Sequence, residues 1–219
     1  MTSVLSRTKI LIVDDHSMVR EGLILRISAY PDLEVCGEAA TEEEAMVLVK
    51  QTQPGLVIVD ISLKSGHGIE LIKRIREFSS TIKILVSSGF QESLYAERAL
   101  RAGALGYLNK QDSGEKVIEA IHTVLRGDRY VSAAITQRLV SQALGNRSEA
   151  ADPIASLSDR ELEIFRMIGN GKTSGSIADE LFLSTHTIDT HRENIKRKLG
   201  LKNAAELSRS AVQFLLENS

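Results

Sequence analysis

Two patterns of apolar residues divide the chain. Up to about residue 130, five short apolar runs alternate with longer segments in which apolar residues recur every three or four positions. The runs occupy residues 10–13, 33–39, 56–59, 82–86 and 106–108. Strands that alternate with amphipathic helices predict an α/β domain, with a parallel sheet covered by helices on both faces. We place this domain at residues 7–130.

A linker separates this domain from the rest of the chain. Residues 133–144 keep an apolar helical spacing, which predicts a short helix that leaves the first domain. Residues 145–153 then contain almost no apolar side chain, but do contain Gly145 and Pro153. We therefore predict a linker with a short helix at residues 131–156 and a second domain at residues 157–219.

The second domain is predicted to be a bundle of four helices. Ser158 and Glu161 have the spacing of a capping box and open the first helix. The second covers about residues 174–181, Ser184 caps a third that runs to Leu199, and Asn203 opens the fourth. A short helix, a tight turn and a longer helix with a polar face indicate a helix-turn-helix unit, whose second helix enters the major groove of DNA.

Composition narrows the setting of the protein. The 219 residues carry 29 acidic and 27 basic side chains, so the net charge indicates no partner by itself. The single cysteine, Cys36, cannot form an internal disulfide. No apolar run reaches the roughly 18 residues of a membrane span, and the first residues lack the apolar core of a signal peptide. We therefore expect a cytoplasmic protein that does not enter a membrane.

Polar groups follow four of the five predicted strands. They are Asp14 and Asp15 after the first, Asp60 after the third, Ser87 and Ser88 after the fourth, and Asn109 and Lys110 after the fifth. The carboxyl ends of parallel strands meet at one edge of a sheet, where ligands bind in such folds. Taken one at a time, these residues could equally be turn residues, helix caps or surface groups.

Together, these groups indicate a site for a metal ion and a phosphoryl group. Three neighbouring carboxylates repel one another unless a cation lies between them, and oxygen ligands with no His or Cys nearby favour Mg²⁺. Lys110 and Ser88 can bind phosphoryl oxygens. Asp60 can act as a nucleophile, because a carboxylate can form an aspartyl phosphate.

These residues resemble the receiver domain of two-component response regulators. The resemblance lies in Val13-Asp14-Asp15-His16, Val59-Asp60, Ser87-Ser88-Gly89 and the stretch that ends in Tyr107-Leu108-Asn109-Lys110. It implies a flavodoxin-like (βα)5 fold with sheet order 2-1-3-4-5. It also implies that a sensor histidine kinase phosphorylates Asp60, that Asp14, Asp15 and Asp60 hold Mg²⁺, and that Ser88 and Lys110 contact the phosphoryl group. Tyr107 takes the place of the aromatic switch residue that turns inward with Ser88 on activation.

The loop after Asp60 departs from the family pattern. The family usually has Met-Pro and an acidic residue before a glycine, whereas Leu63, Lys64 and His67 precede Gly68 here. Because proline fixes a backbone φ angle, its loss is expected to loosen the loop. The lifetime of the phosphorylated state is the property that this change puts in question.

The third helix of the second domain carries the groups suited to DNA. Ile188, Ile195 and Leu199 form one apolar stripe, and the other faces hold hydroxyls, an amide, a histidine and basic groups. Residues 192–202 contain five basic residues and one acidic residue. Such groups suit contacts with phosphates and base edges. A four-helix bundle with a solvated polar face would show the same composition.

The second domain resembles the LuxR-type DNA-binding domain. Leu157-Ser158-Asp159-Arg160-Glu161, Ile177-Ala178-Asp179-Glu180-Leu181 and the helix from Ser184 to Ile195 carry the resemblance. The chain as a whole is similar to the NarL/FixJ class of response regulators. This implies double-stranded DNA as a partner, homodimers on phosphorylation, and DNA contacts by Thr185, Thr187, Thr190, His191, Arg192, Asn194 and Lys198. Ser174-Gly175-Ser176 replaces the usual Asn-Lys-Glu, so DNA affinity is expected to be modest.

The function that fits best is phosphorylation-controlled, sequence-specific DNA binding and regulation of transcription. One alternative is a Mg²⁺-dependent phosphohydrolase with Asp60 as nucleophile. Such enzymes need a general acid two residues after the nucleophile, and Ser62 stands there. Another alternative is a DNA-binding regulator that does not depend on phosphate. A Ser-His-Asp hydrolase is disfavoured because the chain has no G-x-S-x-G stretch.

Overall fold

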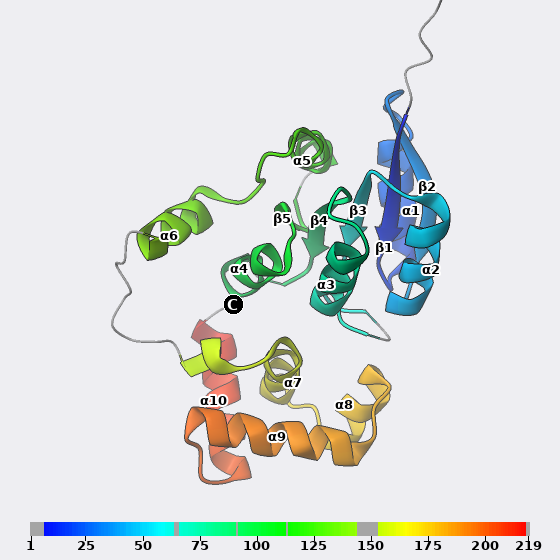
Figure 1. Ribbon diagram of the computed structural model, residues 1–219. Coiled ribbons are helices and arrows are strands. Elements are labelled where there is room, and N and C mark those ends of the chain that lie inside the picture. The colour runs from blue at the N-terminus through cyan, green and yellow to red at the C-terminus, as the bar shows by residue number, and fades with distance from the viewer. Residues whose placement is uncertain (1–6, 64–65, 91, 113, 144–152, 218–219) are drawn as a thin grey trace, which may run out of the picture. The chain divides into compact units, whose positions relative to one another are not determined.

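The chain forms two compact units, which meet in sequence between Val140 and Ser141. The computed structural model describes residues 7–63, 66–90, 92–112, 114–143 and 153–217 (Figure 1). Each unit is described by itself below. The predicted bounds of 7–130, 131–156 and 157–219 stay a prediction, since a division by contacts assigns most of the helix after residue 131 to the first unit.

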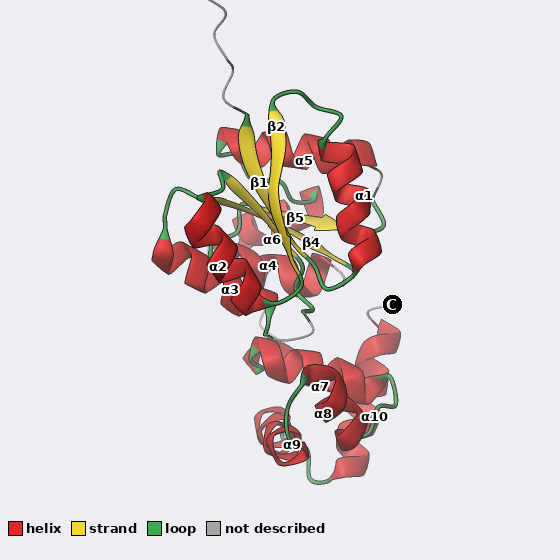
Figure 2. Cartoon of the chain, turned by 90° about the vertical axis from the view of Figure 1, so that its right-hand side faces the viewer, coloured by secondary structure: helices red, strands yellow, loops and turns green. Residues whose placement is uncertain are grey.

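The first unit is built on a five-stranded parallel sheet, drawn in yellow in Figure 2. Its strands are β1 (Thr8–Val13), β2 (Leu33–Ala39), β3 (Leu56–Val59), β4 (Lys83–Ser88) and β5 (Gly106–Asn109). Their order, β2-β1-β3-β4-β5, confirms the predicted topology. β1 and β3 lie side by side inside the sheet, and β3 is buried along its whole length, as expected for a strand covered on both faces.

Helices cover both faces of this sheet (Figure 2). They are α1 (Ser17–Ile27), α2 (Glu42–Thr52), α3 (Gly68–Phe78), α4 (Glu92–Ala102) and α5 (Gly114–Arg126), followed by α6 (Ala133–Ala143). α1 packs beside α5, while α3 packs between α2 and α4. Under α1 and α5, Ile12, Ile58 and Ile121 belong to one apolar cluster. This packing fixes the strands whose ends form the site.

Strand register brings the predicted acids together. Val13 pairs with Val59, so Asp14 and Asp60 follow at neighbouring strand ends. Ser88 pairs with Asn109 on the next two strands. Ser87, Ser88 and Asn109 are the last residues of their strands rather than residues beyond them, because the β4–β5 ladder continues to that pair.

The second unit is helical. A short 3-10 helix, η1 (Pro153–Ser156), precedes α7 (Asp159–Gly169), α8 (Ser174–Leu181), α9 (Thr185–Leu199) and α10 (Ala204–Glu217). Phe165, Ile188, Ile195 and Phe214 are buried and hold α7, α9 and α10 together. The predicted capping box of Ser158 and Glu161 is present. Gly200 ends α9 with a φ of 68°, a left-handed conformation that favours glycine.

Among the described residues, no helix has both the length and the apolar character that crossing a membrane requires.

Candidate functional site

An acidic pocket lies at the carboxyl ends of β1 and β3. Asp14 and Asp60 are each only 2% exposed. The Nζ atom of Lys110, just after β5, lies 2.7 Å from Oδ2 of Asp14 and 2.7 Å from Oδ2 of Asp60. The structure thus brings together three of the predicted site residues, from three different strand ends. A buried cation between two buried carboxylates neutralises part of their mutual repulsion.

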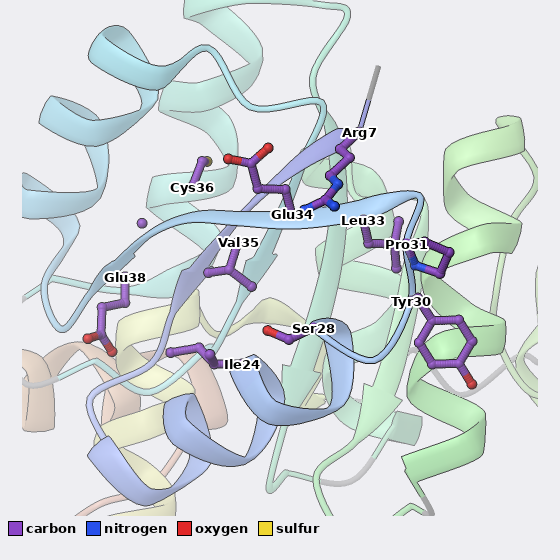
Figure 3. A pocket seen from close by; sticks show the side chains of 11 residues that line it. Arg7, Ile24, Ser28, Tyr30, Pro31, Leu33, Glu34, Val35, Cys36 and Glu38 are labelled. Carbon is purple, nitrogen blue, oxygen red and sulfur yellow. The ribbon is translucent and has the colours of Figure 1, made fainter. Parts of the chain in front are cut away.

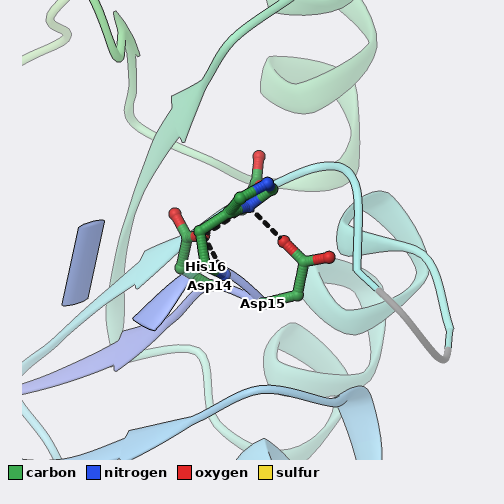
Figure 4. A group of neighbouring side chains, drawn as sticks. Asp14, Asp15 and His16 are labelled. Atoms are coloured by element: carbon green, nitrogen blue, oxygen red, sulfur yellow. Dashed lines mark hydrogen bonds and ion pairs between the residues drawn. The ribbon is translucent and has the colours of Figure 1, made fainter. Parts of the chain in front are cut away.

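The turn after β1 supplies the other two polar groups of the pocket. His16 donates its backbone N–H to Oδ1 of Asp14 at 2.9 Å, and its Nδ1 lies 2.5 Å from Oδ1 of Asp15 (Figure 4). Asp14, Asp15, His16 and Asp60 each offer one ligand atom, and these atoms lie within 4.8 Å of one another. His16 was missed as a site residue, although it directly follows the two acids in the sequence.

Burial changes the acidity of Asp60. The pKa of its carboxyl group is raised to about 6, mainly by burial, and the charge of Asp14 acts in the same direction. Lys110 and the backbone N–H of Ser62 act in the opposite direction. The pKa of Lys110 is raised: burial opposes its charge, but Asp60 and Asp14 together outweigh burial. Asp60 is therefore ionised at neutral pH while lying in a site with little water.

The pocket fits Mg²⁺. Oδ1 of Asp60 is buried and accepts no hydrogen bond from the described residues. An unsatisfied buried acceptor is costly unless a bound group, such as a cation or a phosphoryl group, completes its contacts. The carboxylates of Asp14, Asp15 and Asp60 form the hard oxygen set that Mg²⁺ prefers. His16 adds a nitrogen at the exposed side of this set.

Ser88 and Tyr107 both hold the loop that follows β4. The Oγ atom of Ser88 accepts a hydrogen bond from the backbone N–H of Phe90 at 3.2 Å. The hydroxyl of Tyr107 donates to the carbonyl of Phe90 at 2.9 Å, and its side chain is buried. The Phe90 ring stacks on Tyr95 of α4, with ring centroids 4.9 Å apart. The two predicted switch residues therefore meet at one residue, Phe90.

The loop after Asp60 is anchored where it enters α3. Nδ1 of His67 accepts a hydrogen bond from the backbone N–H of Ile69 and caps this helix. Glu42 accepts from the backbone N–H of His67 at 3.3 Å. A Cβ on Gly68 would lie 2.1 Å from the carbonyl oxygen of Asp60, so only glycine permits this approach. Lys64 lies outside the described residues, and a loosened loop stays a prediction.

The second candidate site is the polar surface of α9. Of the predicted DNA contacts, Thr185, Thr190 and Lys198 are exposed, and Thr187, His191, Arg192 and Asn194 are partly buried. Nζ of Lys198 lies 2.6 Å from Oε2 of the buried Glu161 on α7. Burial lowers the pKa of His191, an effect that Glu161 opposes. Their contact with DNA stays a prediction.

The unusual start of α8 contacts α9. The Oγ atom of Ser174 donates a hydrogen bond to Oδ1 of Asp189 at 2.9 Å. The hydroxyl of Thr173 caps α8 by accepting from the backbone N–H of Ser176. Ser174, one of the residues that depart from the LuxR-type pattern, thus engages an acidic group that would repel phosphate. Sequence reasoning did not foresee this contact.

A separate pocket lies between α1 and the edge strand β2 (Figure 3). Its lining includes Ile24, Ser28, Tyr30, Val35, Cys36 and Glu38. It contains none of the predicted site residues. The chemistry indicated by the sequence is therefore concentrated at the strand ends and on α9.

Two family models match the chain. Residues 10–122 match the response regulator receiver domain. Residues 155–211 match the family described as bacterial regulatory proteins, luxR family. The two matches fall within the two compact units.

Curated relatives match almost the whole chain. The oxygen regulatory protein NreC of Staphylococcus carnosus (strain TM300) is 37% identical over 210 residues, which cover 94% of this chain and 97% of the relative. NreC of Staphylococcus aureus (strain MRSA252) is 35% identical over the same shares.

Solved structures share the architecture. A LuxR-family two-component response regulator from Aurantimonas sp. SI85-9A1 is 35% identical, with a TM-score of 0.58, over 64% of this chain and 99% of that chain. A second match is RcsB from Salmonella enterica serovar Typhimurium, bound to a promoter in the presence of the phosphomimetic BeF3−. It is 22% identical, with a TM-score of 0.64, over 94% of this chain and 98% of that chain. At 22% identity, the likeness to RcsB concerns the fold.

Proposed function

The chain belongs to the two-component response regulators that join a receiver domain to a LuxR-type DNA-binding domain, and we propose that phosphorylation of Asp60 controls how α9 binds DNA. As a member of this family it is a DNA-binding regulator of transcription. The proposed phosphodonor is a sensor histidine kinase, the partner that a receiver domain implies. We place both steps in the cytoplasm, where such a kinase and DNA are within reach.

The observation that carries the proposal is the state of the Asp60 carboxylate. Lys110 holds Oδ2 at 2.7 Å, while Oδ1 has no hydrogen-bond donor among the described residues. Oδ1 can therefore attack phosphorus while Lys110 fixes the orientation of the carboxylate. In the transfer, the P–N bond of a phosphohistidine breaks as the P–O bond to Asp60 forms. The imidazole nitrogen keeps the electron pair.

Asp14, Asp15 and Asp60 are the proposed Mg²⁺ ligands. Bound there, Mg²⁺ would neutralise negative charge on the transferring phosphoryl group. Lys110 would then pair with a phosphoryl oxygen, because its ammonium already lies between Asp14 and Asp60. We also propose that small phosphodonors can phosphorylate Asp60 slowly and that the same pocket catalyses its own dephosphorylation.

The proposed switch consists of Ser88, Phe90 and Tyr107. The Ser88 hydroxyl accepts from the backbone N–H of Phe90, and its hydrogen can be donated to a phosphoryl oxygen on Asp60. Movement of Ser88 toward the phosphate would pull the backbone of Phe90. Because Tyr107 donates to the carbonyl of Phe90, the ring of Tyr107 would have to change its contact as well. This gives phosphorylation a two-state element to bias.

DNA recognition is assigned to α9. Its exposed and partly buried polar residues are proposed to contact the major groove, with Thr185, Thr187, Thr190, His191, Arg192, Asn194 and Lys198 as the contact set. Homodimers formed on phosphorylation would place two copies of α9 on two half-sites. RcsB bound to a promoter offers a fold-level parallel, since its chain aligns with 94% of this one.

The test is a gel-shift assay with promoter DNA at fixed salt. Acetyl phosphate and Mg²⁺ should raise the DNA affinity of the wild type and should leave Asp60→Asn unchanged. Phosphate incorporation, measured on the same samples by mass spectrometry, should be present in the wild type and absent in Asp60→Asn. If Asp60→Asn responds to the phosphodonor as the wild type does, the proposed control by Asp60 is wrong.

A further inference from the structure

Arg20 of α1 contacts the backbone of the acidic pocket. Its Nη1 donates a hydrogen bond to the carbonyl oxygen of Asp14 at 2.7 Å. Its Nε donates to Oε2 of Glu38 on β2 at 2.8 Å. The Arg20 side chain is 16% exposed, so most of it lies inside the structure. One cation therefore links the turn after β1 to the neighbouring strand.

The carbonyl of Asp14 lies one residue beyond the end of β1. The backbone N–H of Asp14 still bonds to the carbonyl of Ala39 on β2, at 3.1 Å. Glu38, which pairs with Arg20, directly precedes Ala39. Asp14, Ala39, Glu38 and Arg20 thus form a closed ring of bonds, which fixes the Asp14 peptide groups on both sides of its Cα atom. The directions of the Asp14 and Asp15 carboxylates depend on this backbone.

Stabilisation of the fold by the Arg20–Glu38 ion pair is not enough to explain this arrangement. Glu38 is 49% exposed, and exposed ion pairs contribute little to stability. The planar guanidinium has several donors in a fixed geometry, so it can bond the Asp14 carbonyl and Glu38 at once. The contact that matters is the charge-assisted bond to the backbone of a proposed metal ligand.

We propose that Arg20, anchored by Glu38, is a positioning residue that sets the Mg²⁺ affinity of the acidic pocket. This inference rests on the proposed function, because it concerns the same Asp14, Asp15 and Asp60 site. Groups that orient metal ligands from behind typically change metal affinity by about tenfold or more when removed. Arg20 itself contacts neither the metal ion nor the phosphoryl group.

The experiment compares Arg20→Gln, Arg20→Lys and Glu38→Ala with the wild type as full chains. The control, Arg26→Gln, removes the same charge from an exposed position of the same helix. Mg²⁺ affinity is measured by isothermal titration calorimetry without any phosphodonor. The rate of phosphorylation by acetyl phosphate is then measured as a function of Mg²⁺ concentration.

For Arg20→Gln we expect about tenfold weaker Mg²⁺ binding and a matching rise in the half-maximal Mg²⁺ concentration. The rate at saturating Mg²⁺ should stay within about twofold of the wild-type rate, because Asp60 and Lys110 are unchanged. Arg20→Lys should resemble Arg20→Gln, since an ammonium cannot reproduce the two-way contact. Glu38→Ala should weaken Mg²⁺ binding less, and Arg26→Gln should have no effect.

If Arg20→Gln binds Mg²⁺ as tightly as the wild type, the inference is overturned. If Arg20→Gln fails to fold, Glu38→Ala decides the matter, and unchanged Mg²⁺ affinity in that variant also overturns it. A wild type that takes up phosphate without needing Mg²⁺ overturns the inference but leaves phosphorylation of Asp60 standing. A wild type that neither binds Mg²⁺ nor accepts phosphate overturns the proposed function as well.

Discussion

The Nζ atom of Lys110 lies 2.7 Å from Oδ2 of Asp60, although the two residues come from different strand ends. Because Lys110 also lies 2.7 Å from Asp14, it compensates two buried carboxylates at once. Replacing it by Met should leave these charges facing each other. We expect Lys110→Met to lower the free energy of unfolding at neutral pH by about 3 kcal/mol, as for other broken buried ion pairs.

Calorimetry would test this effect, with and without Mg²⁺. Since a divalent cation can replace the missing charge, Mg²⁺ should restore more stability to Lys110→Met than it adds to the wild type. Lys116→Met is the matched control, because Lys116 pairs with Asp112 at an exposed site. That control should change stability by less than about 1 kcal/mol. Equal losses in the two variants would contradict the role of Lys110.

Asp60→Asn should stabilise the fold at neutral pH in the absence of Mg²⁺. Burial raises the pKa of Asp60 to about 6 from 3.8, so folding disfavours its ionised form. The loss of stability caused by the buried negative charge is therefore fully present above a pH of about 6, and it disappears as the pH falls toward 3.8. At pH 7 we expect the free energy of unfolding of Asp60→Asn to exceed that of the wild type by about 1–3 kcal/mol. Unfolding measured against pH should show the difference shrinking below pH of about 6.

Replacement by alanine should have opposite effects on stability at Gly68 and at Gly22. Gly68→Ala would place a Cβ 2.1 Å from the Asp60 carbonyl oxygen, so the start of α3 would have to move away from the pocket. We expect Gly68→Ala to lower the free energy of unfolding by about 3 kcal/mol and to weaken Mg²⁺ binding. A Cβ on Gly22 of α1 meets nothing within 4 Å. Gly22→Ala should therefore raise stability by about 1 kcal/mol, and thermal unfolding of both variants checks the contrast.

Glu161 should make the stability of the second unit depend on pH. Burial opposes its charge, but bonds from Lys198 and from the backbone of Ser158 outweigh burial and lower its pKa below 4.5. The ionised form therefore stabilises the fold above pH 4.5, and this contribution is lost as the pH falls through the lowered value. Glu161→Gln should lower the free energy of unfolding by about 1 kcal/mol at pH 7, because the bonds from Lys198 and from the Ser158 N–H would then reach a neutral acceptor instead of a carboxylate.

Calorimetry of the full chain at several pH values would measure this difference in the transition of the second unit. The difference in the free energy of unfolding between Glu161→Gln and the wild type should decrease progressively below pH 4.5. Glu193→Gln serves as control, since Glu193 is exposed and pairs with Lys196 of the same helix. A gap that is constant with pH would show that the charge of Glu161 is not involved.

Arg197 should contribute to DNA binding mainly through charge. It is exposed on α9, and its guanidinium donates a hydrogen bond to Asn194 at 3.0 Å. If it contacts a phosphate, Arg197→Ala should reduce the slope of log affinity against log salt by about 1. Lys50→Ala removes one positive charge from α2 of the first unit and should leave the slope unchanged. Gel shifts over a range of salt concentrations measure both slopes.

The fold and the acidic pocket could be predicted because strand ends are visible in the sequence. Asp14 and Asp60 directly follow an apolar run, Lys110 follows one after Asn109, and parallel strands bring such positions to one edge. The predicted sheet order came from the family resemblance, since apolar runs alone do not say which strands are neighbours. The helix boundaries of the second unit followed from caps such as Ser158 and Ser184.

Contacts between distant elements could not be predicted in the same way. Arg20 reaches the Asp14 carbonyl from within α1, and sequence spacing does not show where a long side chain ends. The contact of Lys198 with DNA stays a prediction, but its ion pair with Glu161, far away in the sequence, was not foreseen. Such pairs depend on how two helices pack, which local patterns do not specify.

The pairing of Val13 with Val59 has a consequence for how the site can fail. Side chains of a strand alternate between its two faces, so a slip of β3 by a single position would turn Asp60 away from Asp14. The chemistry of this protein is thus encoded as much in the alignment of two apolar strands as in the acids that follow them.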